Sequence, residues 1–296
     1  MRLRVGGFQL VGARGLTEGD VILARGVRVD EHTTTIDHVP VFYRSASESR
    51  GRILYLHDAL FSSEDFLPLL ERTGGMAPDL IGFGRSGKGG HLDYTPTGLV
   101  EFLERFLDAQ EMTETALVGH GWGGALALLL ALRRPGLATR LVLIDAVPLL
   151  PGFTWHPAAR LWRRRVVGEL VMGSTPRWLM ARQLRRGATR PETWDSRRLS
   201  AVWEQFDQGT QRALLRLHRA SGEARLQTLG SDLGSVTIPT LVLWGNADPW
   251  FGPQFADAYG ARLPDAIVEH IEEAGHWPWL DQPRVTHRVA EFLSRP

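Results

Sequence analysis

The alternation of short buried strands with helices is the feature that most constrains the fold of this chain. Nearly continuous runs of leucine and β-branched residues occur at RILYLHD (52–58), ALVGH (116–120) and RLVLID (140–145), as in parallel strands buried on both faces. Between them lie a capped amphipathic segment, TPTGLVEFLERFLDAQ (95–110), and an apolar segment, GWGGALALLLALRRP (121–135), which predict helices. The pattern therefore predicts an α/β fold with a mostly parallel sheet flanked by helices.

Two further parts of the chain extend this pattern. VILARGVRV (21–29) and TTIDHVPVFYR (34–44) alternate apolar and polar residues, which predicts an antiparallel pair of strands with one wet face. Toward the C-terminus the alternation of strands and helices returns. There we expect strands within 237–245 and 266–273 and helices near 251–262 and 282–294.

The strand pattern stops in the middle of the chain. Residues 147–232 are helical by pattern, rich in Trp and Arg, and broken by Pro and Gly. A strand–helix core interrupted by a helical segment is typical of a core domain with a cap. We predict an α/β core formed by residues 1–146 and 233–296 and a helical cap formed by residues 147–232.

Composition narrows the chemistry and the partners. The chain has no cysteine, which excludes disulfides, cysteine-bound zinc and a thiol nucleophile. Its formal net charge of +1 gives no reason to expect a nucleic-acid or membrane partner. The first residues lack the apolar run of a secretion signal, and no stretch approaches the roughly 20 apolar residues of a membrane span. We expect a cytoplasmic protein that acts on a small molecule without a metal or another cofactor, and its oligomeric state is not predicted.

A glycine-dense turn is the first of four motifs that carry chemistry. LVGHGWGG (117–124) runs from a predicted strand into a predicted helix, which is the context of a G-x-S-x-G nucleophile elbow. Gly119 and Gly123 occupy the flanking glycine positions, and Gly121 occupies the position of the nucleophile.

The other three motifs also follow predicted strands. Asp248 lies in LWGNADPW (243–250), and His276 lies in EAGHWPWLDQP (273–283). LYLHDAL (54–60) ends the strand that would supply part of an oxyanion hole. A carboxylate paired with a histidine fixes the imidazole tautomer and stabilises the imidazolium, so Asp248 and His276 are candidates for a catalytic dyad.

In this order the motifs resemble the α/β-hydrolase superfamily. The similarity is greatest to capped members such as epoxide hydrolases, haloalkane dehalogenases and ester or carbon–carbon bond hydrolases. It extends over residues 20–296 and includes DLIGFGRSGKG (79–89), which is similar to the family segment D-x-x-G-x-G-x-S. The resemblance implies that Asp248 orients His276, that His276 is the general base, and that the N–H groups of Trp122 and Ala59 form the oxyanion hole.

Three positions depart from the family pattern. Gly121 stands where the family has Ser, Asp or Cys, and Ala59 offers no side-chain donor. Asp58 stands where glycine usually follows the residue matching His57. A carboxylate there would oppose an oxyanion in the hole unless Asp58 points away or is protonated.

Other residues are candidates for parts of the missing chemistry. Asp145 follows a strand and is an alternative acid, although a role as a helix or turn cap is favoured. Ser86 lies in a segment that is a structural turn in the family, and His120 is expected to point away from the pocket because strand residues alternate faces. Neither is expected to replace the nucleophile.

The predicted cap has a distinctive composition. Residues 151–190 contain nine arginines and one acidic residue, Glu169, with Trp155, Trp162 and Trp178 among them. The favoured interpretation is that the arginines are solvated and the tryptophans line an apolar pocket between cap and core. A site for an anionic group remains an alternative.

Three functions are compatible with this sequence. The first is an enzyme that uses the His276–Asp248 dyad without a covalent nucleophile at Gly121, as a lyase, isomerase or cyclase does. The second is a serine or aspartate hydrolase, such as an esterase, epoxide hydrolase or dehalogenase, whose nucleophile has been replaced by glycine. The third is a non-catalytic protein that binds a small molecule. The intact dyad favours an enzyme.

Overall fold

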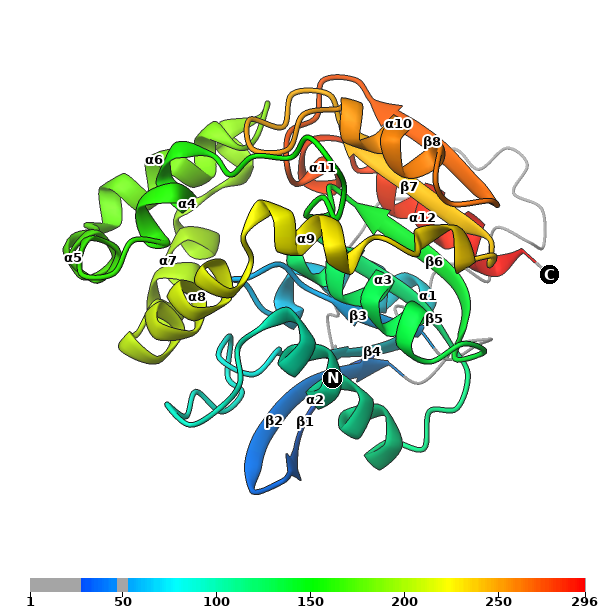
Figure 1. Ribbon diagram of the computed structural model, residues 1–296, viewed down its shortest axis with the longest axis horizontal. Coiled ribbons are helices and arrows are strands. Elements are labelled where there is room, and N and C mark those ends of the chain that lie inside the picture. The colour runs from blue at the N-terminus through cyan, green and yellow to red at the C-terminus, as the bar shows by residue number, and fades with distance from the viewer. Residues whose placement is uncertain (1–27, 47–52, 296) are drawn as a thin grey trace, which may run out of the picture.

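One mostly parallel sheet forms the centre of the molecule. The computed structural model describes residues 28–46 and 53–295, and within them eight strands pair in the order β1-β2-β4-β3-β5-β6-β7-β8 (Figure 1). The β1–β2 and β2–β4 pairs are antiparallel, and the remaining neighbours are parallel. The predicted α/β fold is therefore confirmed. The strands are β1 (Val29–Ile36), β2 (Val39–Ala46), β3 (Ile53–Leu56), β4 (Gly75–Pro78), β5 (Thr115–His120), β6 (Ala138–Ile144), β7 (Thr240–Gly245) and β8 (Ala266–Ile271).

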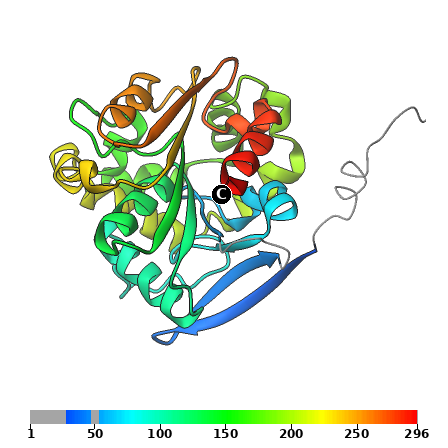
Figure 2. The same cartoon turned by 90° about the vertical axis from the view of Figure 1, so that its right-hand side faces the viewer.

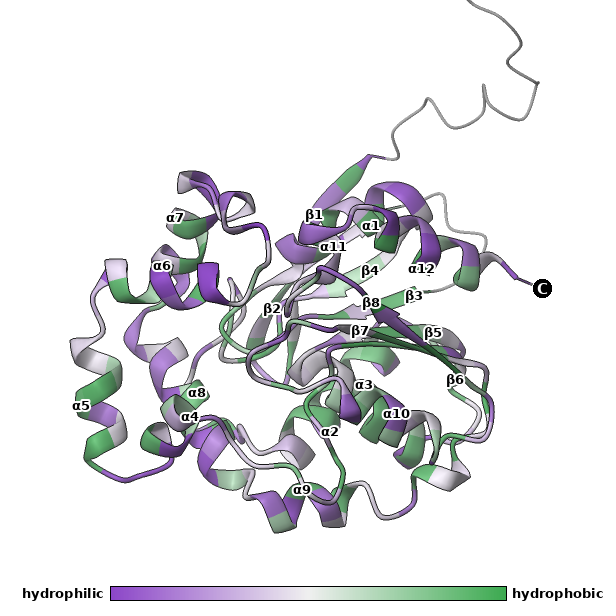
Figure 3. Cartoon of the chain, turned by 90° about the horizontal axis from the view of Figure 1, so that it is seen from above, coloured by the Kyte–Doolittle hydropathy of each residue, from purple (hydrophilic) through white to green (hydrophobic). Residues whose placement is uncertain are grey.

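Helices cover both faces of this sheet. Figure 2 shows α1 and α12 on one face and α2, α3 and α10 on the other. The core helices are α1 (Leu67–Thr73), α2 (Pro96–Ala109), α3 (Trp122–Arg133), α10 (Gln254–Gly260), α11 (Pro278–Asp281) and α12 (Arg284–Ser294), with a 3-10 helix, η2 (Ser63–Phe66), before α1. The hydropathy colouring of Figure 3 shows hydrophobic residues along the central strands. The strands β3 and β5 are buried throughout, as their continuous apolar runs predict.

The N-terminal strand pair differs from its prediction. The predicted strand 34–44 contains the turn of a hairpin, because β1 ends at Ile36 and β2 begins at Val39. Asp37 and His38 form the turn with φ values of 50° and 65°. Two-residue hairpin loops of this kind need positive φ at both central positions, which aspartate tolerates better than most residues. Residues 21–27 of the other predicted strand lie outside the described residues.

Most of the other elements agree with their predictions. Helix α2 begins at Pro96, and the Thr95 side chain accepts a hydrogen bond from the Gly98 N–H at 3.1 Å, so the predicted cap and first turn are confirmed. Strand β4 was not predicted. Its sequence, GMAP, has no β-branched residue and includes both Gly and Pro, so it lacks the usual signals of a strand.

The chain between β6 and β7 is helical. Residues 147–232 are all described, and they contain no strand. In Figure 1, α4 to α8 gather beside one end of the sheet, and α9 returns toward α3. We call this segment the helical insertion. It contains α4 (Pro157–Trp162), α5 (Val167–Ser174), α6 (Arg177–Arg186), η3 (Pro191–Thr193), α7 (Ser196–Gln205), α8 (Gln208–Ala220) and α9 (Glu223–Leu229), and η4 (Leu233–Ser235) follows it. Among the described helices, none is both long and apolar enough to cross a membrane.

Candidate active site

Gly121 forms the sharp turn between β5 and α3. Its backbone has φ 54° and ψ −119°, a conformation that is strained for a residue with a side chain. The Gly121 N–H donates to the Ile144 carbonyl at 3.1 Å, and its own carbonyl accepts from the Val147 N–H at 2.9 Å. Because neighbouring backbone holds the turn on two sides, its shape does not depend on a side chain at position 121.

The flanking glycines allow the strand and the helix to approach each other closely. A Cβ atom at Gly119 would lie 2.3 Å from the Gly123 carbonyl oxygen. A Cβ atom at Gly123 would lie 1.8 Å from the carbonyl oxygen of Leu56 in β3. The glycine pattern found in the sequence is therefore required by contacts of α3 with β5 and β3.

Gly123→Ala is expected to destabilise the fold strongly. The new methyl group would meet backbone, which cannot move aside as a side chain can, so the free energy of unfolding should fall by about 1–3 kcal/mol or more. Gly173→Ala is the matched control, because Gly173 lies in α5 with nothing within 4 Å of the position that the new methyl group would take and alanine favours helix. Urea unfolding of both variants measures the difference. Equal stabilities would contradict the packing argument.

His276 and Asp248 form a buried pair after β8 and β7. The His276 Nδ1 atom lies 2.7 Å from Asp248 Oδ2, and both side chains are almost fully buried. Asp248 Oδ1 accepts the N–H groups of Trp250 at 2.8 Å and Phe251 at 3.2 Å. These bonds fix the carboxylate, which in turn orients the imidazole ring.

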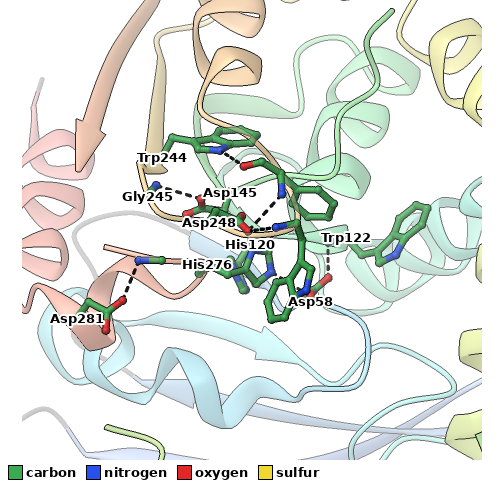
Figure 4. A network of polar contacts seen from close by, with 12 residues as sticks. Asp58, His120, Trp122, Asp145, Trp244, Gly245, Asp248, His276 and Asp281 are labelled. Atoms are coloured by element: carbon green, nitrogen blue, oxygen red, sulfur yellow. Dashed lines mark hydrogen bonds and ion pairs between the residues drawn. The ribbon is translucent and has the colours of Figure 1, made fainter. Parts of the chain in front are cut away.

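Asp58 fills the space beside Gly121, where an elbow side chain would stand. Figure 4 shows its side chain close to Trp122 and His276. A Cβ atom at Gly121 would lie 2.3 Å from Asp58 Cγ and 2.3 Å from its Oδ1 atom. Asp58 Oδ1 accepts the Trp122 N–H at 2.7 Å, and Asp58 Oδ2 lies 3.5 Å from His276 Nε2. The Asp58 carboxylate therefore binds the Trp122 N–H group that was predicted to be an oxyanion donor. It also faces Nε2, the ring nitrogen of His276 that does not bond Asp248.

The charges of this cluster support one another. Burial alone would raise the pKa of Asp58, but its hydrogen bond to His276 and the His276 charge lower that pKa below its ordinary value. Burial alone would lower the pKa of His276, but the charge and hydrogen bond of Asp248, together with Asp58, raise that pKa to about 10. His276 is thus an imidazolium between two carboxylates at neutral pH. Asp58 neither points away from the predicted hole nor has a raised pKa, because it accepts the Trp122 N–H and the adjacent imidazolium compensates its charge.

Asp145 lies next to the dyad but differs from Asp248 in its charge. Its Oδ1 atom accepts the Gly245 N–H at 3.0 Å. Burial, and then the charge of Asp248, raise the pKa of Asp145 well above its ordinary value. Burial therefore favours the neutral form of Asp145, and Asp248 is the carboxylate that bonds His276.

The same three residues provide the atoms that could hold a metal ion. One ligand atom from each of Asp145, Asp248 and His276 lies within 4.8 Å of the others. However, His276 Nδ1 already bonds Asp248, and burial, followed by the charge of Asp248, raises the pKa of Asp145 and so disfavours the carboxylate that a cation needs. The donors thus fit a hydrogen-bonded acid–base cluster better than a cation site.

His57 supports Asp58 and does not face a substrate. Its side chain is fully buried, and its Nε2 atom accepts the Leu80 N–H at 2.9 Å. The Nδ1 atom therefore carries the proton and donates it to the Asp58 carbonyl at 2.7 Å. Because both ring nitrogens of His57 bond backbone groups, His57 is not available to bind a substrate as predicted. It positions the backbone at Asp58 instead. Ala59, the other predicted oxyanion donor, follows Asp58 and is 5% exposed.

The helical insertion is bonded to the loop that carries His276. The His276 N–H donates to the Gly187 carbonyl at 2.8 Å, just after α6. Asp281, which is buried, accepts the N–H groups of Thr189, Arg190 and Gly275 at 2.8–3.0 Å. No motif in the sequence indicates this connection, because Asp281 alone resembles an ordinary helical acid.

Aromatic side chains surround the cluster. Trp250 and Phe251 pack on the His276 ring, with centroids 4.9 and 5.3 Å away. From the helical insertion, Trp155 stacks on Trp122 at 5.8 Å. Trp162 packs next to His218 at 5.1 Å, and burial lowers the pKa of His218 to about 4, so this ring is neutral. Of the three tryptophans predicted to line the pocket, Trp178 does not, because it is 66% exposed.

Ser86 and His120 have structural roles. Ser86 Oγ donates to the Asp79 carbonyl at 2.6 Å and accepts the Phe42 N–H at 3.0 Å. His120 Nε2 bonds the His276 carbonyl at 2.7 Å. Both side chains are buried, and neither replaces a nucleophile at Gly121.

Comparison with known proteins identifies the family of this chain. Residues 53–289 match the alpha/beta hydrolase family. The chain belongs to the alpha/beta hydrolase family. Among its relatives, a 2-hydroxymuconate semialdehyde hydrolase of Pseudomonas putida is 28% identical over 226 residues, which cover 74% of this chain and 76% of that protein. A 2-hydroxy-6-oxo-2,4-heptadienoate hydrolase of Pseudomonas putida strain F1 is 42% identical over 233 residues, which cover 74% of this chain and 78% of that protein.

Solved structures show the same fold. A haloalkane dehalogenase of Bradyrhizobium elkanii has a TM-score of 0.76 and 25% identity, and the match covers 90% of this chain and 98% of that one. An epoxide hydrolase of Acinetobacter nosocomialis has a TM-score of 0.78 and 17% identity, with 90% and 89% covered. At this identity the second likeness concerns the fold alone.

This alpha/beta hydrolase also contains a feature that sequence reasoning missed. The sequence has a carboxylate at position 58 and a glycine at position 121, which read along the chain are two separate departures from the family pattern. The structure brings them together as one exchange, in which a side chain from the loop after β3 occupies the space vacated at the elbow. In the sequence, the only signal of this exchange is that an additional carboxylate at position 58 accompanies the absence of a nucleophile at position 121.

Proposed function

We propose that this chain is an enzyme that converts a largely apolar small molecule between the core and the helical insertion. In this proposal the His276–Asp248 dyad moves the proton, and the elbow residue Gly121 provides no nucleophile. The helical insertion acts as the cap of the site. No metal or cofactor takes part, and neither nucleic acid nor a membrane is the partner.

One observation carries this proposal. His276 Nδ1 is bonded to Asp248 at 2.7 Å, while His276 Nε2 faces the Asp58 carboxylate, which fills the space beside Gly121. A histidine oriented in this way can donate or accept a proton at a bound substrate. The surrounding rings of Trp250, Phe251 and Trp122 favour a substrate with a large apolar part.

The charges favour an enzyme over a simple binding protein. Burying an imidazolium with two carboxylates carries a desolvation cost, which mutual attraction offsets only when the geometry is good. An apolar binding pocket needs no such cluster. Strongly shifted pKa values of buried groups beside a specific charge partner are typical of active sites, and the pKa of buried His276 is raised against the effect of burial by the charges and hydrogen bonds of Asp248 and Asp58.

His276→Ala tests the proposal. Turnover of a substrate found by screening apolar esters, epoxides, haloalkanes and ring-cleavage diketones should fall by about 10²–10⁴-fold, the usual contribution of a positioned acid or base. His270→Ala is the matched control, because His270 also pairs with a carboxylate, Asp257, at 2.9 Å but lies at the surface. Product formation is followed by liquid chromatography. Unchanged turnover in His276→Ala would refute the proposal.

A further inference from the structure

The carboxylate of Asp58 has the contacts of a poised nucleophile, although it comes from a different strand than the elbow. Asp58 Oδ1 is anchored by the Trp122 N–H at 2.7 Å, at the first residue of the twelve-residue helix α3. The positive end of a helix dipole stabilises such an anion. Asp58 Oδ2 faces His276 Nε2 at 3.5 Å, and the side chain is 15% exposed.

We propose that Asp58 is the catalytic nucleophile of this enzyme, supplied from the loop after β3 in place of an elbow residue, and that it opens an apolar strained cyclic ether such as an epoxide. This inference rests on the proposed function, because it uses the His276–Asp248 dyad for both proton transfers. It assigns to Asp58 the covalent role that Gly121 cannot perform.

In the first step the Asp58 carboxylate attacks a ring carbon of the ether. A bond forms between Asp58 Oδ2 and that carbon, and the carbon–oxygen bond of the ring breaks. The released oxygen takes the proton of the His276 imidazolium and becomes a hydroxyl group. The products of this step are an ester of Asp58 and a neutral His276, so charge and protons balance.

In the second step water hydrolyses the ester. Esterification removes the Asp58 charge, which is one of the causes of the raised His276 pKa, so neutral His276 can now act as a base. It takes a proton from water, and the hydroxide attacks Asp58 Cγ. The Trp122 N–H that binds Oδ1 stabilises the oxyanion that forms on that atom. The ester bond breaks, and the leaving diol oxygen takes the proton from His276. The second proton of the attacking water is then on the Asp58 carboxyl group, and its transfer to His276 restores the carboxylate and the imidazolium, so the net reaction adds one H₂O.

The same arrangement leads us to expect that an ester is a poor substrate for this site. In ester hydrolysis, an oxyanion develops on the substrate and needs the donor at Trp122. That donor already binds the Asp58 carboxylate, and two anions would compete for one N–H group. Opening of an epoxide by attack on a saturated ring carbon does not place a substrate oxyanion at the Trp122 N–H.

A single turnover in H₂¹⁸O tests the proposal. Enzyme in excess is mixed with styrene oxide or 1,2-epoxyoctane, and mass spectrometry then locates the label in the diol and in the peptide that contains Asp58. We expect ¹⁸O in the Asp58 carboxylate and ¹⁶O in the first diol, because the diol oxygen comes from the ester. Label in the diol with none in Asp58 would overturn the proposal, as would the absence of diol from both epoxides.

Two variants separate this proposal from the proposed function. Asp58→Asn keeps an acceptor for the Trp122 N–H and should lower turnover by about 10³-fold or more, as loss of a nucleophile does. Asp257→Asn, an exposed carboxylate beside His270, is the matched control and should retain turnover. If turnover depends on His276 but survives Asp58→Asn without label in Asp58, the nucleophile assignment fails and the proposed function stands. If His276→Ala is fully active, the proposed function itself fails.

Discussion

Gly121→Asp is expected to lower the free energy of unfolding by about 2–6 kcal/mol, the sum of backbone strain and overpacking. The strain arises because Gly121 has φ 54°. The overpacking arises because its Cβ atom would lie 2.3 Å from Asp58 Cγ. A second carboxylate beside Asp58 would add repulsion. The single substitution that restores the family pattern is therefore expected to damage the fold without restoring a working elbow.

The reciprocal double variant, Asp58→Gly with Gly121→Asp, should recover much of this loss. Removing Asp58 clears the space that the new side chain needs, so only the backbone strain of about 1–3 kcal/mol remains. Urea unfolding of the wild type, both single variants and the double variant gives the coupling energy, which we expect to be about 1–3 kcal/mol. Additive single effects would show that the two positions do not share one space.

Activity of these four proteins adds a second measurement. In the double variant the carboxylate returns to the elbow and remains near the Trp122 N–H and His276, so turnover of epoxides should be partly retained. Asp58→Gly alone removes the carboxylate and should be inactive. Gly121→Asp alone keeps Asp58 but displaces it, and it should lose activity together with stability.

The fold of this chain could be predicted because its local signals agree. Buried apolar runs indicate β3, β5 and β6, and the Thr95–Pro96 cap indicates the start of α2. Short elements without such signals, such as β4, could not be predicted. The hairpin turn at Asp37–His38 was missed because the run on either side continues the same alternation of apolar and polar residues.

The candidate site could be predicted only in part. Asp248 and His276 follow strands in family order, and the structure places them 2.7 Å apart. The orientation of Asp58 depends on a balance between burial and the charge of His276, which lies 218 positions along the chain. Sequence reasoning accounts for the burial and the lost oxyanion hole, but it does not include the imidazolium that compensates the carboxylate.

The second large effect concerns the dependence of stability on pH. His276 faces the carboxylates of Asp248 and Asp58, neutral Asp145, and His120, whose own pKa burial lowers to about 3. The pKa of His276 rises from an ordinary 6.5 to about 10 in the folded protein. Because the folded state binds this proton more tightly, His276 contributes stability that is fully present below pH 6.5 and is lost as pH rises toward 10.

This loss should appear as a difference between the wild type and His276→Gln. Urea unfolding at pH 6, 8 and 10 should show a stability difference that shrinks at higher pH, by at most about 1.4 kcal/mol per pH unit. The difference is needed because burial also raises the pKa of Asp65 to about 8, so this group lowers the stability of both proteins as pH rises from 6 to about 8. A difference that stays constant from pH 6 to 10 would mean that His276 is not an imidazolium in the folded protein. The first step proposed for Asp58 would then lack its acid, because the proton that the ring oxygen needs is the one bound to His276.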